Sequence, residues 1–402
     1  MVTDEPPWPA RTGYRLRLAE VVHTLCSSFT VDLLVVDFDP SAARDPAPAD
    51  VGLARQVTVA SHDGARSRGA RWMRWTVSRL PRELLARDWS RPRAVLTEWL
   101  SQSSYDVVWF SHAATFVALG DLVDGPVVVD LDNLDAAVVR ARRELGTSRL
   151  RTAADAVDER RWRRVQSEVT ARADVLVVCS DLDRRRVGGP GEVVVLPNGY
   201  ELTRGVPAVT DGGPRGPGGP VLLMVGLLTY GPNLDAAEFF ATSVLPEVRR
   251  ALPNAVFRLV GRYRETAATD VLRARTGVAL VGEVVDVAEE LSAADLVVVP
   301  IRYGGGTRIK ILEAFAHGIP VVTTSAGCEG LDVADGQHVL IADDPLGFAT
   351  ACQRLLEDAS LRRRLVANAR ELWSTSYRWS SVRHNVIAAV EHAARRGASV
   401  EP

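Results

Sequence analysis

Ten short runs of valine, leucine and isoleucine recur along the chain, and most are followed by a longer segment with helical spacing. Within each run the apolar residues are consecutive, which is typical of strands buried on both faces of a parallel sheet. The runs are 31–36, 107–110, 127–130, 175–179, 193–196, 221–225, 256–260, 278–281, 296–300 and 321–324. Repeated β–α units of this kind predict an α/β fold with doubly wound parallel sheets.

A tract rich in glycine and proline at 206–220 separates the two series of runs. Such a tract cannot form the interior of a helix or strand, and 402 residues exceed what one ordinary core holds. We therefore expect an N-terminal Rossmann-like domain at 1–205, a linker at 206–220 and a second Rossmann-like domain at 221–372. Ligands of open α/β sheets bind at the carboxyl ends of the strands, so we expect a central cleft between the two domains.

The composition is that of an ordinary globular protein, with 47% hydrophobic and 24% charged residues. A net charge of −2 argues against a protein that mainly binds nucleic acid. The four cysteines are scattered without a C-x2-C pair, which predicts reduced, mostly buried thiols rather than a zinc site. The N-terminus lacks the features of a signal peptide and no apolar run approaches ~20 residues, so we expect a cytoplasmic protein. The sequence leaves the oligomeric state open.

Lys310 is the only lysine in the chain, and the other 47 of the 48 basic residues are arginine. This lysine is either a chance remnant of a compositional bias or a residue kept for its chemistry. Lysine offers a compact ammonium on a flexible stem, whereas arginine offers a planar fork. The neighbouring residues favour a chemical role.

Lys310 belongs to a glycine-rich loop between the run 296–300 and a predicted helix. The loop reads Gly304-Gly305-Gly306-Thr307-Arg308-Ile309-Lys310. Glycines let the backbone approach a ligand closely, and amide groups at a helix start can receive a diphosphate. Arg308 and Lys310 add positive charge suited to phosphate. Glu313, about one turn further on, can accept hydrogen bonds from the vicinal hydroxyls of a ribose. This combination favours a phosphate site over a plain strand–helix turn.

The loop and the segment Ala314-Phe315-Ala316-His317-Gly318-Ile319-Pro320 resemble the donor site of retaining GT-B glycosyltransferases of family 4. The resemblance is sharpest from 221 to 331 and extends over essentially the whole chain. It implies a UDP- or GDP-sugar as donor, a hydroxyl acceptor (glycan, lipid-linked or secondary metabolite), retention, and neither metal nor cofactor. It also implies a C-terminal helix at 373–402 that packs on the N-terminal domain and is anchored by Trp373, Tyr377 and Trp379.

In this family the second glutamate of an E-x7-E pattern binds the donor ribose, and Glu313 corresponds to it. The first glutamate falls at Gly305, so the chain departs from the pattern. It is similar instead to a subgroup with GGGTR-x-K, in which the glycine backbone, Arg308 and Lys310 face the diphosphate and the sugar. The resemblance assigns additional residues to the donor. These are Gly13, Gly226, Asn233, Gly282 and Glu283.

The first domain is expected to hold the acceptor. We predict that His112, which follows a strand run, acts with Arg308 and Lys310 in catalysis, although a lone histidine is often structural. Candidate acceptor contacts are Arg15, Asp130, Asp132 and Asn198. Asn198 suits an Asn-Gly turn equally well.

Two D-x-D motifs occur, at 130–132 and 181–183. In other glycosyltransferases this motif binds a metal–diphosphate. Both lie in the first domain, away from the phosphate loop. We therefore predict that neither binds a metal and that Asp183 belongs to a helix start.

The segment 66–93 contains nine arginines, two acids and three tryptophans. Such a composition suits an anionic acceptor or peripheral contact with a bilayer. A solvated helix with tryptophans packed beneath it is the alternative.

Three functions remain open from the sequence. The first is an active transferase, the second a GT-B sugar-nucleotide epimerase, and the third a catalytically silent GT-B partner subunit. The epimerase would need acid and base groups around the sugar, whereas a silent subunit has no need of Arg308, Lys310 and Glu313. We favour the transferase.

The phosphate loop generates a prediction about metals. Binding of Mg2+ at the donor phosphates requires carboxylate ligands, and residues 304–310 contain none. Activity should therefore survive exhaustive EDTA treatment. Loss of activity that Mg2+ or Mn2+ restores would contradict the prediction and reopen Asp130 and Asp132 as ligands.

Overall fold

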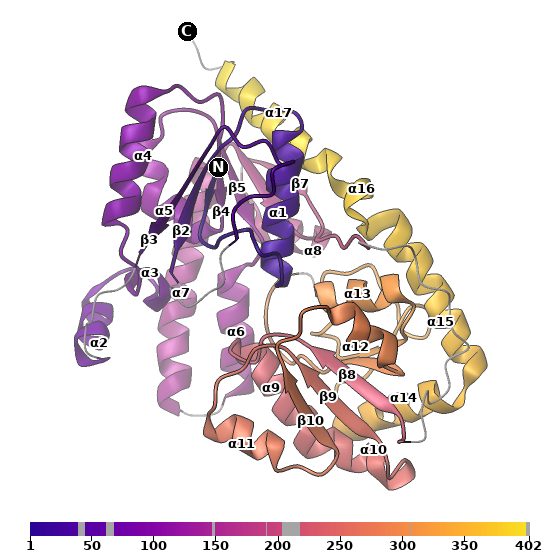
Figure 1. Ribbon diagram of the computed structural model, residues 1–402. Helices are drawn as coiled ribbons and strands as arrows, with labels where there is room; N and C mark the ends of the chain where they lie inside the picture. Colours follow the sequence, from indigo (N-terminus) through magenta and orange to yellow (C-terminus); the bar gives the residue numbers. More distant parts are fainter. Residues whose placement is uncertain are drawn as a thin grey trace. The chain divides into compact units, whose positions relative to one another are not determined.

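The computed structural model (Figure 1) describes residues 1–38, 45–61, 68–146, 149–189, 191–202, 218–306 and 308–398. The chain divides into two compact units, each built on one parallel sheet flanked by helices. The first unit comprises Met1–Pro197 and Val382–Pro402, and the second comprises Asn198–Ser381. This arrangement confirms the prediction of two doubly wound α/β domains.

The sheet of the first unit has seven strands in the order β3-β2-β1-β4-β5-β6-β7, all paired in parallel. Their bounds are β1 Val2–Thr3, β2 Asp32–Asp37, β3 Arg55–Ala60, β4 Val108–Ser111, β5 Val127–Leu131, β6 Val175–Val178 and β7 Glu192–Val195. The chain proceeds outward from β1 to β3 and then, from β4, in the opposite direction. The strand order therefore reverses between β1 and β4, and ligands of such sheets bind at the carboxyl ends beside this switch point.

Successive side chains of β2 show why the helices must cover both faces of this sheet. Leu33 and Val35 pack with Val22 of α1 on one face, whereas Leu34 and Val36 join a second core with Phe110. The helices of this unit are α1 Gly13–Cys26, α2 Arg68–Val77, α3 Arg82–Leu85, α4 Ser90–Gln102, α5 Ala113–Leu119, α6 Asp135–Leu145, α7 Arg149–Arg172, α8 Asp181–Val187 and α17 His384–Ala398. A 3-10 turn, η1 Gly120–Leu122, follows α5.

The sheet of the second unit has six strands in the order β10-β9-β8-β11-β12-β13, also parallel, with its switch point between β8 and β11. The strands are β8 Val221–Val225, β9 Val256–Val260, β10 Val278–Gly282, β11 Leu296–Val299, β12 Val321–Thr323 and β13 Leu340–Ile341. The helices are α9 Gly231–Phe239, α10 Leu245–Ala251, α11 Ala267–Arg273, α12 Val287–Ala293, α13 Ile309–His317, α14 Pro345–Glu357, α15 Ala359–Leu372 and α16 Trp379–Val382. Two π-helical segments, η2 Phe240–Val244 and η3 Trp373–Tyr377, continue α9 and α15.

All ten predicted runs contain strands, with bounds within one or two residues of those expected. Three further strands, β1, β3 and β13, were not predicted. β1 and β13 have two residues each, too few for a hydrophobic run, and β3 lies at the sheet edge with alternating exposure. The central position of β1 matters most because the residue after it, Asp4, lies at the switch point.

The boundary between the units falls earlier in the chain than the sequence indicated. The segment after Pro197 belongs to the second unit, where the Tyr200 amide donates to the Tyr377 carbonyl (2.9 Å) and Trp373 Nε1 donates to the Tyr200 carbonyl (3.0 Å). Most of the predicted linker, 206–217, lies outside the described residues. Trp373, Tyr377 and Trp379 are buried and belong to the second unit, and their role in anchoring the last helix stays a prediction.

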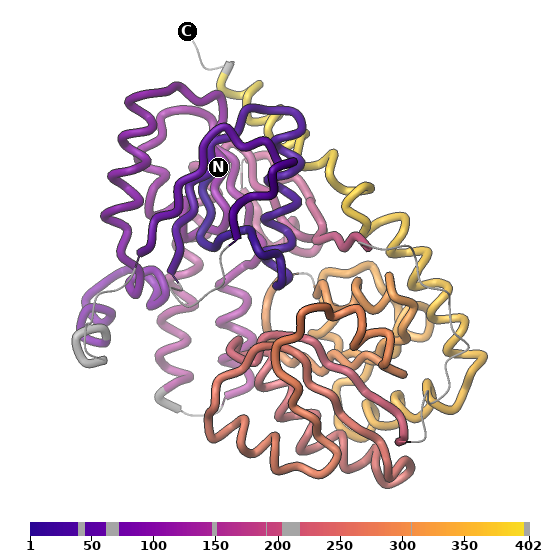
Figure 2. The backbone as a smooth tube through the Cα atoms, in the orientation of Figure 1, coloured from indigo at the N-terminus to yellow at the C-terminus, as the bar shows by residue number. Residues whose placement is uncertain are grey.

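The last helix itself, α17, belongs to the first unit. It contacts α1 and the strands β5, β6 and β7, so the yellow end of the chain lies beside the indigo start (Figure 2). Asn385 Nδ2 donates to the Val195 carbonyl at 3.0 Å, which ties the helix to the end of β7.

All four cysteines are free thiols, and Cys179, Cys328 and Cys352 are buried, as the sequence predicted. None of the helices formed by the described residues combines the length and the apolarity needed to cross a bilayer.

Candidate functional site

In the second unit, glycines follow the strands on one side of the switch point and allow very close backbone packing. Gly226 follows β8 and Gly261 follows β9, with φ of +157° and +141°. A Cβ added at Gly261 would lie 2.1 Å from the Gly226 carbonyl oxygen, and one added at Gly226 would lie 2.9 Å from Lys310 Nζ. Both positions therefore exclude larger residues, and the Lys310 ammonium lies directly over the backbone at the end of β8.

The amide of Asn233 holds Lys310 in this position. Lys310 Nζ donates to Asn233 Oδ1 at 2.8 Å, and Asn233 Nδ2 donates to the Leu227 carbonyl at 2.9 Å. Burial, together with the nearby charge of Arg308, lowers the pKa of Lys310 to about 7. Lys310 as a whole is half-buried, and the Asn233 amide orients its ammonium.

Glu313 follows Lys310 by about one turn on α13 and is also half-buried. Burial raises the pKa of Glu313 to about 7, although the charge of Lys310 opposes the shift. Burial raises the pKa of the Tyr200 hydroxyl, and the nearby charges of Glu313 and Asp286 raise it further. An anionic Glu313 therefore lacks full solvation and would gain from hydroxyl donors of a ligand.

Arg308 precedes α13 and is buried, and its guanidinium donates to the Gly305 carbonyl. Its Nη2 lies 3.0 Å from the position that a Cβ of Gly304 would take. Gly304 and Gly306 have φ of +138° and +70°, a region that favours glycine. Thr307 lies outside the described residues. Gly305 takes the position of the first glutamate in the E-x7-E pattern. It offers only backbone atoms there, and the Arg308 guanidinium donates to its carbonyl.

Gly282 and Glu283 lie at the end of β10, two strands from β8 along the same edge. The Gly282 carbonyl accepts a hydrogen bond from the Gly261 amide at 2.7 Å, and Glu283 is exposed. The donor-side residues that lie in the second unit and are described therefore gather at one edge of its sheet, whereas Gly13 lies in the first unit.

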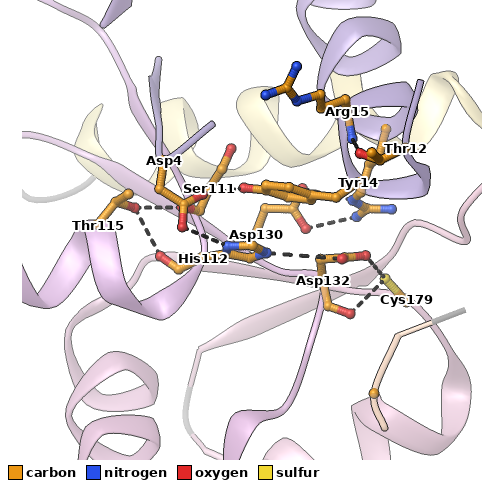
Figure 3. A network of polar contacts seen from close by, with 12 residues as sticks. Asp4, Thr12, Tyr14, Arg15, Ser111, His112, Thr115, Asp130, Asp132 and Cys179 are labelled. Carbon is orange, nitrogen blue, oxygen red and sulfur yellow. Dashed lines mark hydrogen bonds and ion pairs between the residues drawn. The ribbon is translucent and has the colours of Figure 1, made fainter. Parts of the chain in front are cut away.

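A second polar cluster lies at the switch point of the first sheet (Figure 3). Asp4 follows β1, and His112 follows β4, its neighbour. His112 Nδ1 lies 3.1 Å from Asp4 Oδ2, and the Tyr14 hydroxyl donates to Asp4 Oδ1 at 2.7 Å. The Tyr14 and His112 rings are stacked, with centroids 4.1 Å apart. Arg87 also pairs with Asp4, at 3.1 Å.

The cluster keeps His112 charged. Burial alone lowers the pKa of His112, but the interactions with Asp4 and Asp132 outweigh it and raise this pKa well above the ordinary value. Conversely, burial favours a protonated Asp4, yet His112, Arg87 and Tyr14 hold its pKa well below the usual range. His112 Nε2 is 4.0 Å from Asp132 Oδ2, too long for a hydrogen bond. These interactions favour the imidazolium form of His112, which is poorly suited to act as a base, and Nε2 is buried without a hydrogen-bond partner in the described part of the chain.

His112 also has an unusual backbone. Its φ of +70° makes it the only non-glycine residue with positive φ among the described residues, and it immediately precedes α5. Such a conformation costs about 1–3 kcal/mol and persists where the surroundings impose it, frequently at functional sites. The observation strengthens the prediction that His112 has a functional role.

The structure gives Asp130 a structural partner. Both of its carboxylate oxygens accept hydrogen bonds from the buried Arg17, at 2.8 and 3.1 Å, and Arg17 also donates to the Leu196 carbonyl. Asp132 accepts from the Cys179 thiol at 3.3 Å and lies at the edge of the His112 cluster. Asp130 is thus committed to Arg17, whereas Asp132 lies beside His112. In the described residues no three His, Cys, Asp or Glu side chains form a cluster of the kind that holds a metal ion.

The remaining predicted residues lie at the ends of elements. Gly13 is the first residue of α1, and Thr12 caps this helix by accepting from the Arg15 amide at 3.3 Å. Arg15 is buried, and its Nε donates to Glu5 at 3.2 Å. Asn198 is buried at the start of the second unit. Asp183 lies in the first turn of α8, where its amide donates to the Ser180 cap, as predicted.

Sequence reasoning missed Asp4 and Asp135. Asp4 follows a strand of only two residues near the N-terminus. The only sequence pattern that pointed to it was an acidic residue directly after Val2 and Thr3, which both favour strands. Burial, and secondarily the charge of Glu83, raises the pKa of Asp135 to about 7, although His112 opposes the shift. Its position as the first residue of α6 suggested only a helix start.

Comparisons with known proteins bear on the family and the fold. Residues 219–358 match the family model of glycosyl transferases group 1. The chain is 29% identical over 247 residues to a glycogen synthase from Mycobacterium tuberculosis, and the match covers 58% of this chain and 57% of that protein. The chain thus spans little more than half the length of this relative.

Two solved structures share the fold. Sucrose-phosphate synthase from Thermosynechococcus elongatus superposes with a TM-score of 0.69 at 18% identity, covering 96% of this chain and 97% of that one. Anabaena HepE in complex with UDP-glucose superposes with a TM-score of 0.66 at 15% identity, covering 97% and 98%. The fold is therefore GT-B, and residues 219–358 are similar to glycosyl transferases group 1.

The backbone of His112 generates a prediction about stability. His112→Gly and His112→Ala both lose the contacts with Asp4 and Tyr14, but only alanine retains the strained φ. The glycine variant should therefore be more stable than the alanine variant by about 1–2 kcal/mol in chemical denaturation.

The matched control is Thr115, within α5. There the order should reverse, since glycine is less favourable than alanine in a helix by about 1 kcal/mol. If His112→Ala proved as stable as His112→Gly, the strain at this position would be refuted.

Proposed function

We propose that the protein transfers a sugar from a nucleoside-diphosphate sugar to a hydroxyl group of an acceptor, with retention at the anomeric carbon. The observation that supports this most directly is the arrangement at the switch point of the second sheet. There an oriented ammonium, a buried guanidinium and a half-buried carboxylate lie within a few residues of one another on the loop before α13 and its first turns.

The first step of the argument concerns the diphosphate. Phosphate oxygens favour cationic donors, and Arg308 and the protonated form of Lys310 supply them beside the amides at the start of α13. In the unliganded protein the pKa of Lys310 is about 7. A bound diphosphate raises it, because an adjacent opposite charge favours the protonated form. Binding the donor therefore restores the full charge of the site.

The second step concerns the nucleoside. A carboxylate accepts hydrogen bonds from two vicinal hydroxyls, and Glu313 is the carboxylate on the same helix as Lys310. Such bonds to the charged form lower the pKa of Glu313 from about 7, so the ribose stabilises the anion that burial disfavours. Gly282 and Glu283, at the end of β10, are the proposed neighbours of the base.

The third step concerns the reaction. The bond from the anomeric carbon to the diphosphate oxygen breaks, and a bond from this carbon to the acceptor oxygen forms on the same face. The acceptor proton passes to the departing diphosphate, so no protein nucleophile or metal is required. Lys310 and Arg308 stabilise the negative charge that develops on the leaving group.

The first unit is proposed to contribute His112 and the acceptor contacts. As an imidazolium, His112 would donate a hydrogen bond from Nε2 to a hydroxyl of the sugar or the acceptor. Asp132, on the far side of Nε2, would accept a hydrogen bond from the same ligand. Arg15 and Asn198 remain proposed acceptor contacts, whereas the pairing with Arg17 leaves Asp130 a supporting role.

The relatives support this class of donor and product. HepE was solved with UDP-glucose, and glycogen synthase is named for a glycan product. We therefore propose a UDP- or GDP-sugar as donor and a glycan, lipid-linked or small-molecule hydroxyl as acceptor.

A panel of nucleotides and nucleotide sugars tests the proposal. The matching nucleotide sugar should raise the melting temperature, because a ligand that binds only the native state stabilises it. Glu313→Gln should weaken binding of the matching nucleoside diphosphate by about 1–3 kcal/mol in calorimetry. The effect should vanish with the 2′,3′-dideoxy nucleotide.

Glu289→Gln is the control, since Glu289 is exposed on α12 and makes the same change of charge. No stabilisation by any nucleotide sugar would refute the donor class. An unchanged ratio of ribo to dideoxy affinity in Glu313→Gln would refute the ribose contact alone.

The contact between Asn233 and Lys310 generates a second prediction. If Asn233 positions the ammonium, Asn233→Ala and Lys310→Ala should be non-additive in the free energy of nucleoside-diphosphate binding. Coupling energies between residues in contact are about 0.5–3 kcal/mol. Calorimetry on the wild type, both single variants and the double variant measures the coupling.

Asn233→Ala combined with Arg275→Gln is the control pair, because Arg275 is exposed on the segment after α11. This pair should be additive. Additivity of Asn233→Ala with Lys310→Ala would show that the 2.8 Å contact does not position the cation for the ligand.

A further inference from the structure

We propose that the first unit docks on the surface of an anionic lipid bilayer through a patch formed by α2 and α7. The α2–α7 patch consists of Trp72, Met73, Val77, Arg79, Arg160 and Arg164. The proposal does not depend on the transferase activity. It concerns a face of the molecule that the proposed donor and acceptor residues do not include.

A hollow of about 400 Å3 lies between the end of α2 and the exposed face of α7, and arginines dominate its lining. Arg79, Arg160 and Arg164 are all exposed. None of these three side chains has a hydrogen bond or ion pair with any of the described residues. Three neighbouring guanidinium groups without an ion-pair partner among the described residues repel one another, and an external anion would relieve this repulsion.

Three acidic residues of α7 already form ion pairs within the protein. Asp155, Asp158 and Glu159 of α7 are buried, and they pair with arginines of α3, α6 and α7. These three carboxylates face inward, whereas the fourth acid of α7, Glu168, is exposed, pairs with Arg172 and lines an adjacent hollow with Arg79 and Arg164. The local surface is cationic although the whole chain has a net charge of −2.

Apolar side chains lie next to these arginines. The exposed large hydrophobic residues of the described chain number eleven, and five of them belong to this region: Trp72, Met73, Val77, Leu80 and Val157. Val77 is 83% exposed and Met73 68%. Such a concentration of exposed apolar residues marks an interaction surface rather than scattered surface variation.

The patch is attached firmly to the fold. Trp75 of α2 is buried, and its Nε1 donates to Asp158 Oδ1 of α7 at 2.9 Å. The Arg161 guanidinium lies 4.7 Å from the centre of the Trp75 ring, and Arg161 also donates to the Leu80 carbonyl. Trp72 lies against Trp75, with ring centroids 4.8 Å apart. The buried tryptophan fixes α2 so that its apolar residues and the arginines of α7 form one surface.

The patch combines cationic and apolar side chains, and this combination favours an anionic bilayer as the binding partner. An anionic bilayer offers phosphate groups to the arginines and an acyl boundary to Trp72, Met73 and Val77. A soluble polyanion would leave these apolar side chains in water. A symmetric contact between two copies would bring the two sets of unpaired arginines together. The sequence left a bilayer contact at 66–93 open beside an anionic acceptor and a solvated helix, and the structure adds α7 to this surface.

Sedimentation with lipid vesicles tests the proposal. The full chain should bind vesicles of phosphatidylglycerol and phosphatidylcholine, bind pure phosphatidylcholine weakly, and dissociate as salt increases. Replacing Arg79, Arg160 and Arg164 together by glutamine should weaken binding at least about tenfold. Met73→Gln with Val77→Ser should also weaken it, but without reducing the salt dependence.

Matched controls make the same changes elsewhere. Arg275, Arg354 and Arg383 are exposed and are replaced by glutamine in the charge control, while Val285→Ser with Leu346→Gln is the apolar control. Both controls should bind as the wild type does, and thermal unfolding verifies that every variant is folded.

Three outcomes would overturn the proposal. They are absence of vesicle binding, equal loss in patch and control variants, and a concentration-dependent dimer that the patch variants abolish. Binding to heparin together with failure to bind vesicles would identify a soluble polyanion instead.

Discussion

Strands that are buried on both faces leave few places where polar side chains can lie, and this constraint organises both units. Every residue of β5 is buried, and the one charge within it, Asp130, is neutralised by the equally buried Arg17. Polar groups with access to ligands therefore gather at the carboxyl ends of the strands. In each unit they concentrate where the strand order reverses: between β1 and β4 in the first and between β8 and β11 in the second.

The sequence was sufficient to predict the architecture and the cationic loop of the second unit. Runs such as 221–225 and 256–260 are continuous and apolar, and they became β8 and β9 with the same bounds. The residues Arg308, Lys310 and Glu313 are close in sequence, so one turn of helix was enough to bring them together. Local patterns of this kind need no knowledge of tertiary structure.

The cluster around His112 could not be predicted in the same way. Asp4 and His112 are 108 residues apart and meet only because β1 pairs with β4. A strand of two residues, β1, gives no hydrophobic pattern, so nothing in the sequence placed Asp4 at the centre of a sheet. The charge state of His112 and the pairing of Asp130 with Arg17 are likewise products of tertiary contacts.

The arginine-rich composition has a practical consequence for the donor site. Because Lys310 is the only lysine, it is the only side-chain primary amine in the chain. Burial and Arg308 lower its pKa to about 7, so a large fraction of this amine is neutral and nucleophilic at physiological pH. Apart from the α-amino group of Met1, whose pKa burial lowers to about 6, an acylating or aldehyde reagent would find Lys310 as the one amine, at a position over the end of β8. The chain thus possesses a built-in attachment point for a spectroscopic reporter of donor-site occupancy, without any engineered cysteine.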